Sequence, residues 1–234
     1  MIKYLSKANP RQFKGKTVLL RVDLNIENAR DEASLFRLDA VLPTIKYLLR
    51  AKARVVLMSH RGRPEVIRKG QNLRDFSLGL FALIIAKRLC HDIEFIVAYR
   101  MGGVKKALEK TDARVILLEN LRFFRGEEDN DPSFAKALAT FGDYYVNDAF
   151  AVSHRKNASV VAITNFLPSY AGLQLENEIL HLKKIRGITK KPFTLIIGGA
   201  KTADKAGVLE YFSKKADWIL LGGGPANTFF KAAG

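Results

Sequence analysis

Short apolar runs along the chain alternate with segments whose apolar residues recur at helical spacing. The apolar runs, rich in Val, Leu and Ile, predict strands at residues 17–24, 54–59, 92–98, 114–119 and 143–147. The segments between them predict helices at residues 33–50, 78–89, 103–110 and 132–141. Regular alternation of strand and helix is typical of an α/β protein with a doubly wound parallel sheet, and we expect that fold here.

A polar, charge-rich helix predicted at residues 174–191 separates this block from a second one. Its apolar positions suit one buried face, and they are Leu175, Ile179, Leu182 and Ile185. The second block predicts two strands, at 193–197 and 217–221, with a helix at 204–215 between them. Because a two-stranded parallel unit cannot cover both of its faces, we expect this second α/β domain to be incomplete and the chain to be truncated within it.

The net charge of the chain indicates which class of partner it binds, and says little about its fold. The 234 residues include 39 Lys and Arg against 23 Asp and Glu, which gives a formal net charge of +16. Such a balance favours an anionic partner, and nucleic acid, anionic lipid and phosphorylated metabolites all remain open at this point. Hydrophobic residues make up 48% of the chain, which indicates a folded globular protein and not a disordered one.

The sequence also indicates a compartment. Cys90 lies in an apolar run, so we expect it to be buried as a small hydrophobic residue in a reducing environment. No stretch approaches the roughly 18 consecutive apolar residues of a membrane span. The N-terminal residues lack the continuous apolar core of a secretion signal. We therefore expect a cytoplasmic protein.

Polar residues gather where four of the five predicted strands of the first block end. These residues are Arg21, Asp23 and Asn25; His60, Arg61 and Arg63; Glu119, Asn120 and Arg122; and Asn147, Asp148, His154 and Arg155. Parallel strands end at one edge of a sheet, so these side chains should converge there, and Arg37 at the start of the first helix could join them. The planar fork of arginine suits phosphate or carboxylate. The alternative for each single arginine is a solvated surface charge.

The remaining polar residues of these clusters favour hydrogen bonding over catalysis. His60 and His154 have no paired nucleophile in the sequence, so we expect them to be hydrogen-bonding members of an anion site or packing residues. We expect Asp23, Glu119 and Asp148 to form internal salt bridges, and we predict no metal site from them.

Residues 193–205 predict a second place for phosphate. An apolar strand runs into a glycine pair, and the segment that follows is typical of the opening of a helix. Exposed backbone N–H groups and the positive end of a helix then point at the same spot. Lys201 and Lys205 are spaced i, i+4 and can reach one group of anionic oxygens. An ordinary strand-turn-helix with solvated lysines is the alternative.

Six motifs, in order along nearly the whole chain, resemble those of the phosphoglycerate kinase family. They are RVDLN at 21–25, SHRGRP at 59–64, LLENLRF at 117–123, VNDAFAVSHR at 146–155, GGAKTADK at 198–205 and GGGPANTF at 222–229. The resemblance implies two Rossmann-like domains that close about a hinge, one for 3-phosphoglycerate and one for the Mg-nucleotide. It assigns residues 1–171 to the first domain, 172–191 to an interdomain helix and 192–234 to the beginning of the second.

The resemblance also implies roles for particular residues. The substrate site would contain Arg21, Asp23, Asn25, Arg37, His60, Arg63, Arg122 and Arg155. Lys201 would accompany the transferred phosphoryl group and, with Arg37, neutralise its charge. The nucleotide site would contain Lys201, Lys205, Gly222, Gly223 and Gly224. Mg2+ would accompany ATP or ADP as co-substrate.

The implied activity is reversible phosphoryl transfer between 1,3-bisphosphoglycerate and ADP, which gives 3-phosphoglycerate and ATP in glycolysis. We expect a monomer without membrane or nucleic-acid partners. Asn157 stands where the family usually has a histidine, Ala151 and Val152 replace a usual Gly-Thr pair, and Pro225 is unusual after the triple glycine. The alternatives are an inactive fragment or a binding-only α/β protein that holds a phosphorylated anion, and, from charge alone, a nucleic-acid-associated protein.

Overall fold

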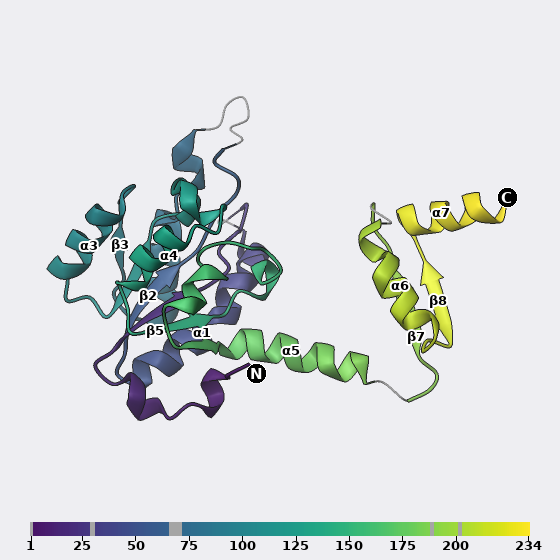
Figure 1. The fold of residues 1–234 in the computed structure, drawn as a ribbon, viewed down its shortest axis with the longest axis horizontal. Helices are drawn as coiled ribbons and strands as arrows, with labels where there is room; N and C mark the ends of the chain where they lie inside the picture. The colour runs from purple at the N-terminus through teal and green to yellow at the C-terminus, as the bar shows by residue number, and fades with distance from the viewer. Residues whose placement is uncertain (1, 29–30, 66–71, 188–189, 201–202) are drawn as a thin grey trace. The chain divides into compact units, whose positions relative to one another are not determined.

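The chain contains two compact units, residues 1–180 and 181–234, as Figure 1 shows. The computed structural model describes residues 2–28, 31–65, 72–187, 190–200 and 203–234. Among the helices in these ranges, none is long and apolar enough to cross a membrane.

Within the described ranges, the first unit contains a six-stranded parallel sheet with the strand order β3-β4-β2-β1-β5-β6. The strands are β1 (Thr17–Arg21), β2 (Arg54–Met58), β3 (Glu94–Ile96), β4 (Val115–Leu118), β5 (Tyr144–Asn147) and β6 (Ser169–Ala171). At the centre of the sheet, Leu19 pairs with Val56 on one side and with Tyr145 on the other. Strands buried on both faces are typical of parallel sheets, which explains their continuous apolar runs.

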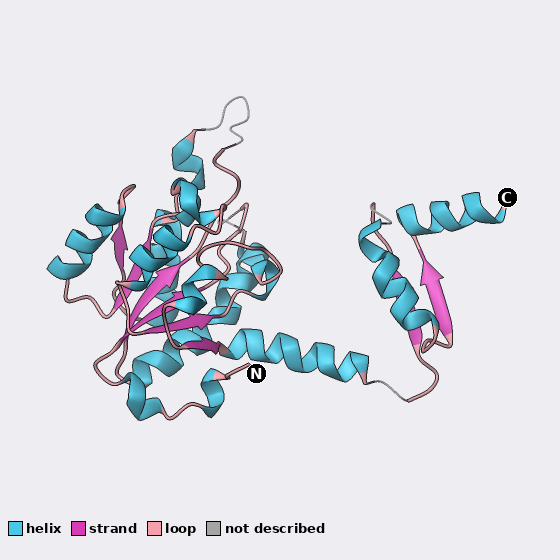
Figure 2. Ribbon diagram, viewed as in Figure 1, coloured by secondary structure: helices cyan, strands magenta, loops and turns pink. Residues whose placement is uncertain are grey.

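Helices cover both faces of this sheet, as Figure 2 shows. The helices of the first unit are α1 (Phe36–Arg50), α2 (Gly79–Leu89), α3 (Met101–Lys110) and α4 (Pro132–Ala139). Successive residues of β1 point to opposite faces, so Leu20 packs in the core with α1 and α2 while Leu19 packs in the core with α3 and α4. The predicted α/β fold with a doubly wound sheet is confirmed.

The sequence missed one strand. β6, which pairs with β5, has the sequence Ser-Tyr-Ala and contains no apolar run, so no local pattern predicted it. The strand predicted at residues 17–24 is shorter in the structure. Regular strand pairing stops at Arg21, and residues 22–24 form a buried segment beyond it. The first helix begins at Phe36, after a 3-10 turn at Glu32–Leu35.

Two burial predictions were wrong. Cys90 is exposed, because α2 turns its apolar side inward at Phe81, Ala82 and Ile85 and ends at Leu89, one residue before the cysteine. The helix α5 (Leu173–Arg186) buries Leu175, whereas Leu182 and Ile185 are 44% and 41% exposed. Helical spacing shows which residues share one face of a helix. Whether that face is buried depends on which other elements pack against it.

The second unit is smaller. In its described part, β7 (Thr194–Ile197) and β8 (Trp218–Leu221) pair in parallel, with α6 (Ala206–Ser213) between them in sequence and α7 (Gly223–Ala233) after them. The ring of Phe193 packs edge-on against that of Phe212 on α6. Ile196, Trp218 and Leu220 are 75%, 66% and 52% exposed, so one face of the strand pair is apolar and uncovered.

Candidate functional site

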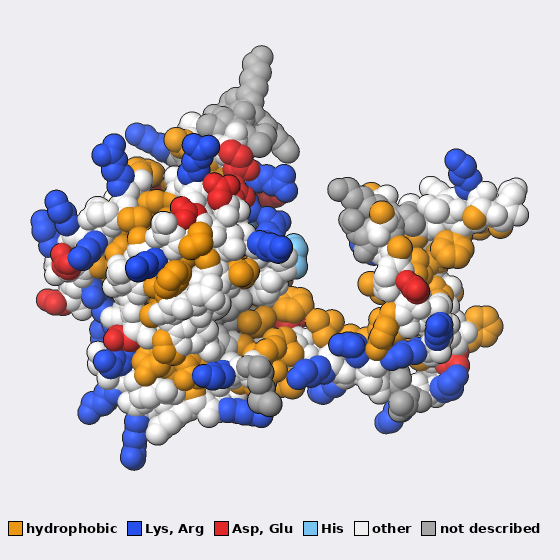
Figure 3. Space-filling model, in the orientation of Figure 1, with side chains coloured by type: hydrophobic (Ala, Val, Ile, Leu, Met, Phe, Trp, Pro, Cys, Tyr) orange, Lys and Arg blue, Asp and Glu red, His pale blue; other side chains and the backbone are white. Residues whose placement is uncertain are grey.

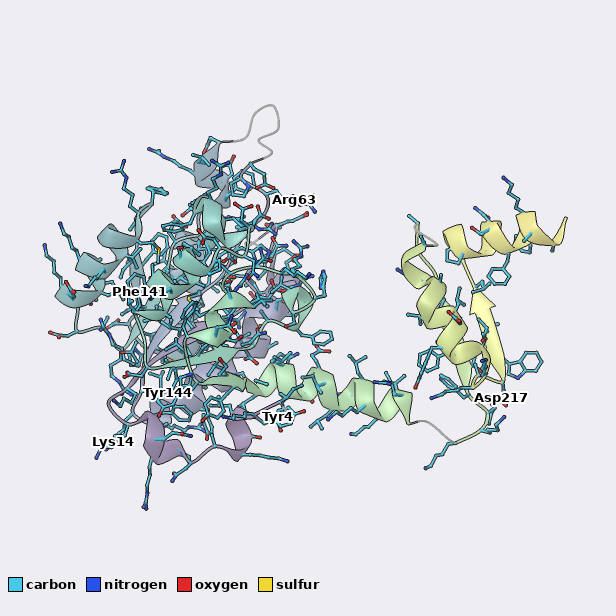
Figure 4. The ribbon with its side chains drawn as sticks, in the orientation of Figure 1. Tyr4, Lys14, Arg63, Phe141, Tyr144 and Asp217 are labelled. Carbon is cyan, nitrogen blue, oxygen red and sulfur yellow. The ribbon has the colours of Figure 1, made fainter. Side chains whose placement is uncertain are left out.

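The polar segments that follow β1, β2 and β4 converge on one cavity of about 640 Å³. The residues that line it are Asn25, Ile26, Glu27, Arg61, Gly62, Arg63, Asp75, Phe76, Arg122 and Arg155. Figure 4 places Arg63 at the far end of the unit from Tyr144, the residue with which β5 begins, so the cavity lies where the strands end. Figure 3 shows Lys and Arg side chains over much of the surface of this unit. Convergence of the strand-end residues agrees with the general position of ligand crevices in open α/β sheets.

The predicted arginines differ in how they are held. Arg63 is exposed, whereas the side chain of Arg122 is only 5% exposed and its guanidinium pairs with Glu128 at 3.2 Å and donates to the carbonyl oxygen of Gly62. Burial lowers the pKa of Arg122, and Glu128 opposes that shift. Arg122 is therefore fixed in direction, while Arg63 stands in contact with solvent.

Arg21 lies beneath the cavity and not on its wall. Its side chain is 1% exposed, and Nε donates to the hydroxyl of Ser159 at 3.0 Å. Nη1 donates to the carbonyl oxygen of Val22 at 2.5 Å, and Nη2 lies 2.9 Å from Nδ1 of His60. The contacts of Arg21 orient its neighbours and keep it inside the fold.

His60 is buried and neutral. Because a guanidinium only donates, Nδ1 of His60 accepts from Arg21 and Nε2 must carry the hydrogen. Burial, followed by the positive charges of Arg21, Arg122, Arg155 and Arg37, lowers the pKa of His60 to about 2. Nε2 has no hydrogen-bond partner among the described residues, so its N–H is an unpartnered buried donor. The other histidine of the prediction, His154, is exposed.

Asp23 organises the turn after β1. Its Oδ1 accepts from the backbone N–H of Asn25 at 3.0 Å, and its Oδ2 pairs with Nη1 of Arg37 at 3.2 Å. The amide oxygen of Asn25 accepts from the N–H of Gly62 at 2.8 Å, which ties this turn to the loop after β2. The salt bridge expected of Asp23 is present, and it holds Arg37 near the cavity with its side chain 40% exposed.

Within the described ranges, neither Glu119 nor Asp148 forms the salt bridge that was expected of it. Glu119 accepts hydrogen bonds from the hydroxyl of Ser77 at 2.8 Å and from the N–H of Leu78 at 2.9 Å, so its charge serves the start of α2. Asp148 accepts from the N–H of Leu175 at 2.9 Å and serves the start of α5. Both carboxylates accept hydrogen bonds from backbone N–H groups at helix starts. The salt bridges had been expected because an arginine lies nearby in the sequence, and that nearness does not reveal these backbone partners.

Arg61 lines the cavity and the buried Asn120 holds it by hydrogen bonds; the strand-end prediction included both residues but gave neither a specific role. Arg61 donates to the carbonyl oxygens of Ile26, Glu27 and Ser77 at 3.1, 3.0 and 3.3 Å. The amide of Asn120 accepts from the N–H of Arg61 at 3.2 Å and donates to its carbonyl oxygen at 2.8 Å. Their position at strand ends predicts that both residues lie near the site. Their backbone hydrogen-bond partners are far along the chain and are known only from the folded structure.

Asn157, which replaces a usual histidine, is 7% exposed and donates to the backbone oxygen of Glu127 at 3.3 Å. It is absent from the cavity lining in the described part of the chain. Ala151 is exposed and Val152 is buried. None of these three residues is among the described residues that line the cavity.

The glycine segments of the second unit pack backbone to backbone. The N–H of Gly224 donates to the carbonyl oxygen of Gly199 at 2.8 Å, and a Cβ on Gly224 would lie 2.6 Å from the carbonyl oxygen of Ala200. Gly223 has φ +61°, a conformation that glycine adopts without strain. Cε of Lys205 lies 3.8 Å from the place of a Cβ on Gly199, so this lysine borders the same loop. Gly222 faces open space, and Lys201 lies outside the described residues.

Comparison with known proteins agrees with the motifs. The sequence model of the phosphoglycerate kinase family matches residues 8–234. Phosphoglycerate kinase of Desulforudis audaxviator is 46% identical over 224 residues, which are 94% of this chain and 56% of that protein. The Maricaulis maris enzyme is 44% identical over 222 residues, 94% of this chain and 54% of that protein. The chain thus spans about half the length of the curated relatives it matches.

Solved structures give the same result. The phosphoglycerate kinase of Coxiella burnetii has a TM-score of 0.80 and 32% identity, and the match covers all of this chain and 57% of that one. The Pyrococcus horikoshii enzyme has a TM-score of 0.83 and 32% identity, with 100% and 58% covered. Since the family model spans residues 8–234 and the fold agrees with these structures, this chain belongs to the phosphoglycerate kinase family.

Proposed function

We propose that the first unit binds 3-phosphoglycerate and that the chain serves the phosphoglycerate kinase reaction. The reaction transfers a phosphoryl group reversibly between 1,3-bisphosphoglycerate and ADP, giving 3-phosphoglycerate and ATP. The observation that carries this proposal is that Arg63, Arg122 and Arg155, which come from three separate loops, line one and the same cavity. Three guanidinium groups around one cavity suit a ligand with a phosphate and a carboxylate.

The residues of the substrate site have different tasks in this proposal. Arg63, Arg122, Arg155 and Asn25 line the cavity and would contact the ligand. Arg21 and Asp23 would form its support, because both are buried and hydrogen-bonded to neighbours of the cavity, and the buried His60, held by Arg21, would offer its Nε2–H to the ligand. Arg37, held by Asp23 but partly exposed, would neutralise charge on the transferred phosphoryl group.

The second unit would hold the adenine nucleotide through Lys201, Lys205 and the glycines 222–224. Support comes from Lys205, which borders the loop at Gly199, and from the open space at Gly222, where backbone could approach a ligand closely. Mg2+ would accompany the nucleotide phosphates and lower their charge. The described ranges contain no group of three or more His, Cys, Asp or Glu side chains that could hold a metal.

The proposal includes a domain assignment and a setting. Residues 1–171 would be the 3-phosphoglycerate domain, 172–191 the interdomain helix and 192–234 the beginning of the nucleotide domain. The protein would be a cytoplasmic monomer, without nucleic acid or membrane as a partner. A binding-only protein is the second candidate, favoured by the observation that the cavity lining comes wholly from residues 25–155.

Calorimetry of 3-phosphoglycerate binding to the 234-residue chain tests the site. The double variant Arg63→Ala, Arg122→Ala should bind about 100-fold more weakly or worse, because each charged hydrogen bond contributes roughly 1.5–3 kcal/mol. A charge-matched control is Lys106→Ala, Lys110→Ala, which removes two positive charges from the exposed side of α3. This control should bind like the unmodified chain.

Equal weakening in both double variants would show that net charge and not a built site attracts the ligand, and would overturn the proposal. Absence of binding by the folded, unmodified chain would overturn it as well. Binding without phosphoryl transfer to or from the nucleotide, measured on the same preparation, would favour the binding-only candidate.

A further inference from the structure

A buried row of hydrogen bonds runs beneath the cavity from Glu127 to His60. The hydroxyl of Ser159 lies 2.6 Å from Oε1 of Glu127 and 3.0 Å from Nε of Arg21. Nη2 of Arg21 lies 2.9 Å from Nδ1 of His60. Each of these four residues is at most 2% exposed, so water does not compete for the bonds. We call this row the Glu127 relay.

Donor and acceptor chemistry gives the relay one direction. Arg21 can only donate, so the hydroxyl oxygen of Ser159 accepts from its Nε, and the single hydroxyl hydrogen is left for the carboxylate of Glu127. At the other end, the same guanidinium donates to Nδ1 of His60 and leaves the hydrogen on Nε2. The carboxylate and the histidine tautomer are therefore linked through Arg21.

The relay also places a carboxyl group near the buried positive charge of Arg21. Arg21 is a buried cation, and a buried charge without compensation is strongly unfavourable. Burial raises the pKa of Glu127, while Arg21 and the two hydrogen bonds from Ser159 oppose that rise. Glu127 is thus the carboxylate that the relay offers to Arg21, and the positive charge of Arg21 in turn opposes the rise in the pKa of Glu127 that burial causes.

The surrounding backbone fixes the carboxylate end. The N–H of Ser159 donates to Oε2 of Glu127 at 3.0 Å, and the N–H of Ala158 donates to its backbone oxygen at 2.8 Å. The hydroxyl of Tyr145, on β5, donates to the carbonyl oxygen of Ser159 at 2.7 Å. Because these bonds join Glu127 to the sheet, the relay has a rigid base.

We propose that Glu127, acting through Ser159, is a positioning residue of the 3-phosphoglycerate site. It holds Arg21 in the orientation that fixes His60 as the Nε2–H tautomer, with that N–H available to an oxygen of the ligand. The unpartnered Nε2 of His60, buried among the described residues, is the group through which the relay reaches the ligand. The identity of the ligand rests on the proposed function, whereas the relay itself does not.

The variant Ser159→Ala tests the relay most directly, because it removes the bridging hydroxyl and keeps the backbone N–H that binds Glu127. Glu127→Gln is the second variant. Long-range ¹H–¹⁵N spectra of the labelled chain report each histidine tautomer, and the signal of His60 is identified by its loss in His60→Gln. Glu109→Gln, on the exposed side of α3, is the matched control.

In the unmodified chain and in the control, His60 should give the Nε2–H pattern without change from pH 5.5 to 8. In folded Ser159→Ala and Glu127→Gln, Arg21 loses its link to an ionisable carboxyl group and is oriented less firmly, so His60 should show both tautomers and 3-phosphoglycerate should bind roughly tenfold more weakly. Unchanged tautomer in the folded variants would overturn the relay, even if affinity falls. A different His60 tautomer in the unmodified chain would overturn it without any variant.

The two proposals fail separately. If the unmodified chain does not bind 3-phosphoglycerate, the proposed function fails, and the spectra still decide whether Glu127 controls His60. If the chain binds and the spectra of the variants stay unchanged, the proposed function stands and the relay is wrong.

Discussion

Asp148 is a buried carboxyl group at the end of β5 whose surroundings disfavour its charge. The residue is 1% exposed, and Oδ2 has no hydrogen-bond partner among the described residues. Burial raises the pKa of Asp148 to about 6, although hydrogen bonds from Thr44, Leu175 and Gln174 oppose that rise. Oδ1 therefore accepts a hydrogen bond at the start of α5, while Oδ2 has no hydrogen-bond donor among the described residues to stabilise a negative charge.

The raised pKa predicts a sign for the pH dependence of stability. The folded state binds the proton of Asp148 more tightly than the unfolded state, so its contribution falls as pH rises from about 4 to about 6. Asp148→Asn cannot ionise and offers an N–H at the unpartnered position. Relative to the unmodified chain, we expect the variant to gain about 2–3 kcal/mol in unfolding free energy between pH 4 and pH 7.5.

Urea unfolding of the first unit at both pH values measures this difference. The exposed Asp129→Asn provides the control, because it makes the same chemical change at a position that is in contact with solvent. A pH-independent difference for Asp148→Asn would show that Asp148 does not titrate in this range.

At the scale of elements, the joint between β6 and α5 depends on one glycine. Gly172 follows β6, and its N–H donates to the carbonyl oxygen of Asn147 at 2.8 Å. A Cβ at this position would lie 2.3 Å from Oδ1 of Asp148, the atom that accepts from the N–H of Leu175. The close approach of backbone to carboxylate explains why glycine stands here.

Gly172→Ala should therefore destabilise the first unit by about 2 kcal/mol or more, because the added methyl group displaces Asp148 from the start of α5. Gly102→Ala is the matched control, since Gly102 lies in α3 with open space around a Cβ. That change should be neutral or stabilise by up to about 1 kcal/mol. The comparison is made by urea unfolding, and equal effects of the two changes would contradict the proposed close approach.

At the scale of the whole molecule, the two units differ in how completely their sheets are covered. The first unit has cores on both faces of its sheet, whereas the described strand pair of the second exposes Ile196, Trp218 and Leu220 on one face. Two strands with one open face are marginal in water. The two units should therefore open with different free energies.

Hydrogen exchange of the intact chain measures that difference. Amides of β7 and β8 should exchange at least roughly 100-fold faster than those of β1 and β2, because less apolar burial opposes their opening. Amides of β3, at the edge of the larger sheet, give an internal comparison for edge effects. Equal protection of β7 and β1 would contradict this prediction.

The sequence by itself determined most of the elements, the fold class and the family. The alternation of apolar runs and helical spacing comes from burial of neighbouring residues, which is a local property, so the strands β1 to β5, β7 and β8 and the helices between them could be predicted from it. Strand-end position also predicted the arginines at the cavity, because parallel strands end together. The roles given to these residues toward a substrate and a nucleotide stay predictions.

Only the tertiary structure decided which groups hold one another. The strand β6 has no apolar pattern and exists because its backbone pairs with β5. Glu127 and Ser159 lie far along the chain from Arg21, and no periodicity links them to it. Hydrogen-bond direction and the compensation of a buried charge depend on atoms brought together by folding, whereas the pattern along the chain records only which side of each element is buried.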